Sequence, residues 1–255
     1  MAKHSKKTKK GAWIWIGIVA CICVMIYAGF QIYSETEEDN MGNGAYLSLK
    51  ETITSIEPAG ASAGSTATTG QRVDIPALKK ISGDAVGWIY AEGTPIDYPV
   101  MQGEDNSFYL NHLYDGTKNR LGSIFLDYRN AQDFSDQNSI LYGHHMKSGK
   151  MFAALEKYKE QSYYDGHPSL TLDTQNGSYR VELLAGYVVD GSVNDLQLNF
   201  GNGEEFLSFV ETVKGKSTFR SDVAVQGTDR IVTMVTCTYD FQNARYALIG
   251  KLVSI

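Results

Sequence analysis

The feature that most constrains this chain is an uncharged apolar run near its N-terminus. Residues 12–30 read AWIWIGIVACICVMIYAGF and contain no charged side chain. A helix of 19 residues spans roughly 28 Å at about 1.5 Å per residue, close to the hydrocarbon thickness of a bilayer. The run therefore predicts a membrane-spanning helix, and we interpret residues 12–33 as a transmembrane signal anchor.

The charges on either side of this run predict its orientation. Five lysines lie within the basic tail at residues 1–11, and acidic residues follow the run at 35–39. The positive-inside rule then places the N-terminus in the cytoplasm and the rest of the chain outside, in a single-pass protein of the cell membrane. The alternative is a cleaved signal peptide, which would have a shorter apolar core ending in an A-x-A-like site. The run lacks such a site.

The chain beyond the anchor divides into two parts by composition. Residues 34–72 are polar and then small, as in PAGASAGSTATTG at 58–70, which predicts a flexible extracytoplasmic stalk. We expect a short amphipathic helix at Tyr46–Ile56 to interrupt this stalk. Residues 73–255 show no internal repeat and are long enough for one domain that buries roughly 70% of its unfolded surface.

The charge balance excludes one class of partner. Five of the 23 Lys and Arg precede the apolar run and all 29 Asp and Glu follow it, so the outer part carries a net charge of −11. Nucleic-acid binding requires a basic stripe to contact phosphates. We therefore expect no nucleic-acid partner.

The pattern within residues 73–255 predicts a mainly β fold. Helical spacing occurs at Ile75–Ser82, Lys150–Lys159 and Glu204–Lys214. Eight short β-branched or aromatic segments predict strands, and TQNGSY carries the Asn-Gly of a two-residue hairpin turn. Eight strands with few helices favour a closed barrel or a sandwich. The segments are VGWIYAEG, DYPVMQG, GSIFLDYR, SILYGHH, SLTLDT, YRVELLAGYVV, RIVTMVTC and RYALIGKLVSI.

One cysteine lies outside the apolar run. Cys21 and Cys23 are within the run, whereas Cys237 ends the β-branched stretch TMVTC just before a polar loop. An unpaired extracytoplasmic cysteine indicates a reactive thiol or an intermolecular bridge. The remaining alternative is a small buried hydrophobe.

An arginine is expected beside this cysteine. If RIVTMVTC and RYALIGKLVSI pair as an antiparallel hairpin, Cys237 and Arg245 face each other at the mouth of the loop Thr238–Ala244. A fixed positive charge favours a thiolate, and a guanidinium can donate hydrogen bonds to an oxyanion. The alternative for Arg245 is an ordinary ion pair with Asp240.

A cysteine nucleophile also needs a proton carrier, usually histidine. Four histidines follow the anchor: His112, His144, His145 and His167. His144 and His145 end a strand-like segment directly after Gly143, a position comparable to that of Cys237. Successive side chains of a strand point to opposite faces, so we expect only one of the pair to face Cys237.

With these residues in place, the chain resembles the class B sortases, membrane-anchored cysteine transpeptidases of Gram-positive bacteria. Their signature T-L-x-T-C stands here as Thr233-Met234-Val235-Thr236-Cys237, with a volume-conserving methionine in place of leucine. The resemblance covers residues 75–255. Further matching stretches are GWIYAEGTPIDYPVMQ at 87–102, NSFYLNHLYDG at 106–116, GSIFLDYRN at 122–130 and ILYGHHMKSGKMF at 140–152.

The resemblance implies an eight-stranded sortase-type β-barrel with N-terminal helices and a helix before the penultimate strand. It also implies a catalytic trio and a choice between the adjacent histidines, with His145 pointing away. The implied catalytic residues are His144, Cys237 and Arg245, and the implied substrate-binding residues are Asn106, Leu110, Leu196 and Thr236.

The implied reaction is acyl transfer. The enzyme would cleave an NPxT- or xPxTG-like sorting signal after threonine in a secreted protein and pass the acyl group to an amine of the peptidoglycan precursor lipid II. We expect no metal or cofactor, because the sequence has neither a Cys/His ligand cluster nor an acidic calcium loop. The alternatives are a pilus-assembling sortase, with a pilin lysine as nucleophile, and an inactive surface binding module.

Overall fold

The computed structural model describes residues 9–54, 73–191 and 196–255, which fall into two units at Met1–Gly44 and Ala45–Ile255. Helix α1 (Lys9–Thr54) supplies the described part of the first unit, and its large apolar side chains between Trp13 and Tyr33 are exposed. Within the described ranges, α1 is the one helix whose length and composition suit a membrane span.

The last turns of α1 belong to the second unit and pack into it. Tyr46, Leu49 and Ile53 are buried, and the Tyr46 hydroxyl donates a 2.6 Å hydrogen bond to the carbonyl of Gly122. These three residues form one apolar stripe at helical spacing. The short helix expected at Tyr46–Ile56 is present up to Thr54 as these last turns. Over residues 34–45 the structure differs from the expected stalk, because α1 is continuous there. The rest of the expected stalk, residues 55–72, lies outside the described residues.

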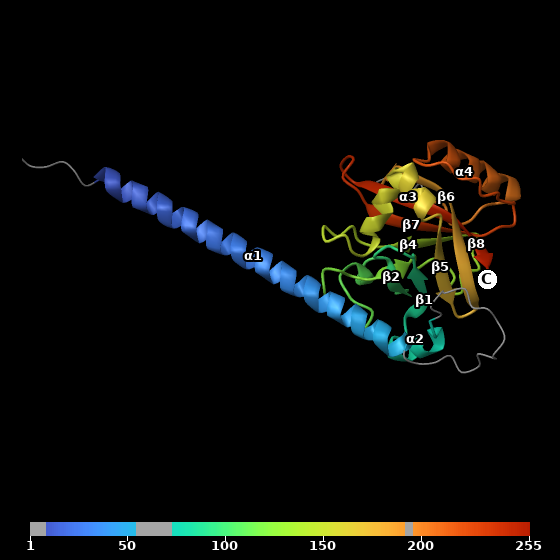
Figure 1. Ribbon diagram of the computed structural model, residues 1–255, viewed down its shortest axis with the longest axis horizontal. Helices are drawn as coiled ribbons and strands as arrows, with labels where there is room; N and C mark the ends of the chain where they lie inside the picture. Colours follow the sequence, from blue (N-terminus) through green and yellow to red (C-terminus); the bar gives the residue numbers. More distant parts are fainter. Residues whose placement is uncertain (1–8, 55–72, 192–195) are drawn as a thin grey trace, which may run out of the picture. The chain divides into compact units, whose positions relative to one another are not determined.

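Eight strands close into a barrel in the order β1-β2-β3-β4-β7-β8-β6-β5 (Figure 1). The pairs β2–β3 and β4–β7 are parallel, and the other neighbours are antiparallel. The expected barrel is therefore confirmed, and the sandwich is excluded. The strands are β1 (Ala85–Tyr90), β2 (Asp97–Met101), β3 (Ile124–Leu126), β4 (Asn138–Tyr142), β5 (Ser169–Thr174), β6 (Gly177–Asp190), β7 (Ile231–Cys237) and β8 (Ala244–Ser254).

The helix expected before the penultimate strand is present as α4 (Gly203–Lys216), which lies against β6 (Figure 1). The side chain of Asn202 caps its first turn, and Phe206, Val210 and Val213 form its buried stripe. The remaining described helices are α2 (Ile75–Ile81), η1 (Phe108–Leu110), η2 (Phe152–Lys159) and α3 (Gln161–Gly166).

Two local expectations differ in detail. The helical segment at 150–159 is a 3₁₀ helix, η2, because its fully buried residues Phe152, Leu155 and Tyr158 recur every third position, which matches three residues per turn. The β5–β6 hairpin is present, but its two turn residues are Gln175 and Asn176, and the following glycine already belongs to β6.

Candidate active site

The C-terminal hairpin has the predicted register. Cys237 in β7 pairs with Arg245 in β8, at the mouth of the loop between the two strands. Both residues line a pocket of 490 Å³ together with His144. The expected trio thus meets in one place, although its members come from β7, β8 and the segment after β4. The other lining residues are Asn106, Leu110, Phe125, Tyr142, Gly143, Gly191, Val235 and Thr236.

Cys237 is the exposed last residue of an otherwise buried strand. Its thiol is free, and it opens to the pocket. The interpretation of Cys237 as a small buried hydrophobe is therefore wrong. An exposed thiol beside a guanidinium has the surroundings of a nucleophile.

Arg245 is half-buried and keeps donors available for a ligand. Its Nη1 donates to the carbonyl oxygens of Asn243 at 3.4 Å and Ala244 at 3.2 Å. Among the described residues, its Nε and Nη2 have no hydrogen-bond partner. Asp240, the alternative partner for Arg245, instead forms an ion pair with Lys159 at 2.6 Å.

His144 is held by the backbone of another residue of the pocket lining. Its Nε2 lies 2.7 Å from the carbonyl oxygen of Leu110, the last residue of η1. A carbonyl only accepts hydrogen bonds, so Nε2 carries a proton and the neutral ring keeps its free lone pair on Nδ1. The contact fixes the ring while leaving one nitrogen for chemistry.

His145 points away from the pocket. Its Nε2 lies 2.7 Å from a carboxylate oxygen of Glu156, and its ring meets Tyr239 edge to face. Strand β4 ends at Tyr142, earlier than expected, but the amide of Gly143 still donates to the carbonyl of Val235 at 3.1 Å. Because of this bond, the backbone stays extended beside β7 as far as Gly143. The side chains of His144 and His145 therefore still point to opposite faces.

Gly143 is needed for a close approach at this point. A Cβ at this position would lie 2.7 Å from the ring of Phe152 and would also overlap Ile124. Real Cβ atoms do not approach other heavy atoms so closely. A larger residue would push the backbone of His144 away from the pocket.

The amide of Asn106 is oriented by a fully buried carboxylate. Asn106 lines the pocket, donates to Asp127 at 2.9 Å and accepts from the amide of Tyr128 at 3.0 Å. Burial opposes ionisation of Asp127, but hydrogen bonds from Arg129, Asn106 and Tyr142 outweigh it and hold the pKa of this carboxyl below its ordinary value. The amide of Asn106 is therefore fixed in one direction.

The structure brings together three of the four residues expected to bind substrate. Leu110 and Thr236 line the pocket with Asn106, and among the described residues the buried hydroxyl of Thr236 has no hydrogen-bond partner. Leu196 is half-buried and does not line this pocket. Residues 192–195, which precede it, lie outside the described residues.

Sequence reasoning did not predict every lining residue, and Tyr142 and Gly191 show two different reasons. Tyr142 lies two positions before His144, so strand alternation could have placed both side chains on one face. Gly191 lies against Arg245, where a Cβ would come within 3.0 Å of the arginine side chain. No local signal predicts this contact, because it depends on the pairing of β6 with β8.

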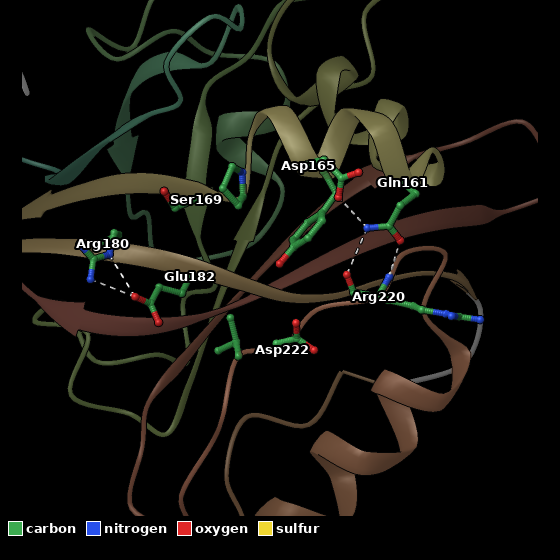
Figure 2. A pocket seen from close by; sticks show the side chains of 10 residues that line it. Gln161, Asp165, Ser169, Arg180, Glu182, Arg220 and Asp222 are labelled. Carbon is green, nitrogen blue, oxygen red and sulfur yellow. Dashed lines mark hydrogen bonds and ion pairs between the residues drawn. The ribbon is translucent and has the colours of Figure 1, made fainter.

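A larger hollow of 890 Å³ lies between α3, β5, β6 and the segment after α4 (Figure 2). Its ten lining residues include neither cysteine nor histidine. Two of its charged side chains, Arg180 and Glu182, form an ion pair with each other at 3.0 Å. Size alone therefore does not identify the reactive site. Within the described ranges, no group of three or more His, Cys, Asp or Glu side chains could hold a metal ion.

Comparison with known proteins agrees with this geometry. The model of the sortase domain family matches residues 89–253. Sortase B of Listeria monocytogenes serovar 1/2a is 36% identical over 91% of this chain and 93% of its own length. A Staphylococcus aureus sortase B–substrate complex has a TM-score of 0.76 and 32% identity over 86% of this chain and 99% of that chain. A sortase B complexed with triglycine has a TM-score of 0.74 and 33% identity over 85% and 99% of the two chains.

These matches extend over the barrel, the strand that carries the thiol and the strand that carries the guanidinium. They reach well beyond the pocket, since the family model covers residues 89–253 and the substrate complex covers 86% of the chain. The chain belongs to the sortase family, as a class B sortase and thus a cysteine transpeptidase.

Proposed function

We propose that this sortase cleaves the sorting signal of a secreted protein after threonine, using Cys237, His144 and Arg245. Anchoring of proteins to the cell wall is the activity of its family. The observation that carries the assignment of roles is the pairing of Cys237 with Arg245 at the mouth of a pocket that His144 also lines.

The first half-reaction forms a thioester. The Cys237 thiolate attacks the carbonyl carbon of threonine, and the oxygen becomes an oxyanion that accepts hydrogen bonds from the unengaged donors of Arg245. Collapse of this tetrahedral intermediate breaks the C–N bond. Protonated His144 gives its proton to the departing amine, and the acyl group stays on sulfur.

The second half-reaction transfers the acyl group to an amine. His144, now neutral, takes a proton from the incoming amine as its nitrogen attacks the thioester carbonyl. The second oxyanion collapses, the C–S bond breaks, and Cys237 leaves as a thiolate. The relative solved with triglycine supports an amino-terminal glycine of the wall precursor lipid II as this nucleophile.

The peptide would lie along Asn106, Leu110 and Thr236. The sortase B–substrate complex supports a peptide in this pocket, and an NPxT-like or xPxTG-like motif is the sequence we propose for it. Leu196 would contact the peptide from outside the described pocket. A pilin lysine is the alternative amine, because it offers the same nucleophilic group.

The apolar part of α1 would anchor the enzyme, with its N-terminus in the cytoplasm and the barrel outside the cell. The lysine-rich residues 1–11 and the acidic residues 35–39 support this orientation. The barrel would then stand on the side of the membrane to which sorting substrates are secreted.

The test is a peptide assay with the full chain in detergent. NPxT-like and xPxTG-like peptides are incubated with triglycine or with an N-acetyl-lysine amide, and products are identified by mass. We expect cleavage after threonine and transfer to one amine, and we expect Cys237→Ala to abolish both. Cleavage by Cys237→Ala at the wild-type rate would remove this thiol from the mechanism. Absence of cleavage and transfer by the wild type would favour an inactive binding module.

A further inference from the structure

A cluster of polar side chains lies behind the β7–β8 loop, on the side away from the pocket. We call it the anchoring cluster, and it consists of His145, Glu156, Lys159, Thr238 and Asp240. Lys159, at the end of η2, is its centre: Nζ donates to Glu156 at 2.8 Å, to the Thr238 hydroxyl at 3.0 Å and to Asp240 at 2.6 Å. One lysine therefore fastens the loop that follows Cys237 to η2.

The charge of Lys159 holds two carboxylates at one hydroxyl. Glu156 and Asp240 lie 2.7 and 2.6 Å from the same Thr238 oxygen. Hydrogen bonding to Lys159 keeps the pKa of Asp240 below its ordinary value. Burial raises the pKa of Glu156, but the hydrogen bonds from Lys159 and Thr238 outweigh burial and keep that pKa below its ordinary value as well. Without the ammonium group, two negative charges would face each other across Thr238, and their repulsion would displace the loop.

The backbone connects this cluster to Arg245 through a single carbonyl. The amide of Thr238 donates to the carbonyl of Ala244 at 3.1 Å. The guanidinium of Arg245 donates to the same carbonyl oxygen at 3.2 Å. The residue that Lys159 fastens and the arginine that faces the pocket thus share one acceptor, and a shift of Thr238 moves that acceptor.

We propose that Lys159 is a positioning residue that sets the direction of the Arg245 guanidinium. It acts through Thr238 and the Ala244 carbonyl and does not touch the substrate. The inference rests on the role proposed above for Arg245. It predicts that the loss of Lys159 lowers kcat only while Arg245 is present.

The test is a double-mutant cycle in the full chain, with kcat and KM measured on one sorting peptide. We expect Lys159→Met to lower kcat about 10-fold with little change in KM, and Lys159→Arg, which keeps the charge, to retain most of the rate. In the Arg245→Lys background, Lys159→Met should cost less than about twofold, because the group that it positions is already lost.

The matched control is Lys157→Met. Lys157 is an exposed lysine of the same helix whose ammonium lies 5.5 Å from the ring of Tyr163, and its loss should change kcat by less than about twofold. Thr238→Val removes the shared hydroxyl, keeps Lys159, and should show the same dependence on Arg245, so the test survives if Lys159→Met misfolds.

The outcomes separate the two proposals. If Arg245→Lys is as active as the wild type, the proposed role of Arg245 fails. If Arg245→Lys is impaired but Lys159→Met costs the same in both backgrounds, or costs nothing in either, the positioning role of Lys159 is overturned.

Discussion

The β7–β8 loop separates two groups of polar side chains that use their hydrogen-bonding capacity in opposite ways. On the pocket side, His144 and Arg245 bond only to backbone carbonyls among the described residues, and Arg245 leaves donors unengaged. On the far side, the ammonium of Lys159 makes three hydrogen bonds and the hydroxyl of Thr238 has three partners.

Under the proposed mechanism, the difference indicates which side can stabilise a transition state. Donors that are already aimed but unengaged can bind an oxyanion without first breaking other bonds, which is the condition for electrostatic preorganisation. Donors that are fully engaged, such as those of Lys159, supply rigidity instead. The two adjacent histidines lie on opposite sides of the loop: His144 lines the pocket, and His145 belongs to the anchoring cluster.

Among the following variants, the largest effect should come from His144→Ala. We expect His144→Ala to lower turnover on the order of 10² to 10⁴-fold, the usual range for a positioned general acid or base. His145→Ala, which removes one member of the anchoring cluster, should stay within several-fold of the wild type. Values of kcat/KM for both variants on one sorting peptide test the comparison. If His145→Ala lowered kcat/KM more than His144→Ala, then His145 and not His144 would be the proton carrier of the pocket.

Arg245→Lys tests the unengaged donors directly. Charge is kept, but a point ammonium cannot reproduce the planar fork of the guanidinium, and we expect kcat to fall on the order of 10²-fold. Thiol alkylation, measured in a Cys21→Ser/Cys23→Ser background, serves as the control that Cys237 remains accessible. A near-normal turnover would make Arg245 a structural residue.

Asp127→Asn sharpens the comparison by weakening an engaged group that orients Asn106. Asp127 has a lowered pKa, so its ionised form stabilises the fold above the unfolded pKa of about 4, and this contribution is lost as pH falls through the folded pKa. We expect the variant to lose about 2 kcal/mol at pH 7 and turnover to change only several-fold. Denaturant unfolding at pH 7 and pH 3 checks this. If the difference in unfolding free energy between the wild type and the variant is as large at pH 3 as at pH 7, the loss comes from altered hydrogen-bond geometry and not from the lost charge.

Leu49→Ala should have the smallest effect on activity. Its buried side chain fastens the end of α1 into the second unit, and truncation should cost about 2–4 kcal/mol of stability. Turnover at 25 °C should be unchanged, because neither side of the loop is touched. A fall in kcat/KM with the variant still folded would show that general destabilisation contributes to the effects above. The same contact means that a truncated protein should begin at Ala45 and not at Arg72.

Local pattern predicted much of the fold. The eight strands follow from β-branched runs between turn residues, and the facing of Cys237 and Arg245 follows from the short loop that joins their strands. The choice of His144 over His145 needed the resemblance to class B sortases. Strand alternation predicts that only one of the two side chains faces Cys237, but it does not say which one.

Contacts between distant segments could not be predicted in this way. The parallel pairing of β4 with β7 joins segments about 90 residues apart, and no turn signal marks it. Lys159 and Asp240 are 81 positions apart, and each looks like an ordinary surface charge in the sequence. The short helix at the end of α1 was expected, but its packing was not. Its buried face consists of only three residues, Tyr46, Leu49 and Ile53, in an otherwise mostly polar segment.

The placement of β7 between β4 and β8 has a consequence for the nascent chain. The barrel cannot close before β7 and β8 are made, and β7 is also the strand that ends in Cys237, the proposed nucleophile. A chain that has been synthesised only as far as β6 therefore has an open sheet and lacks Cys237. The long-range β4–β7 pairing must form before His144 and Cys237 share a pocket. The order of synthesis thus prevents His144 and Cys237 from meeting until the barrel is almost complete.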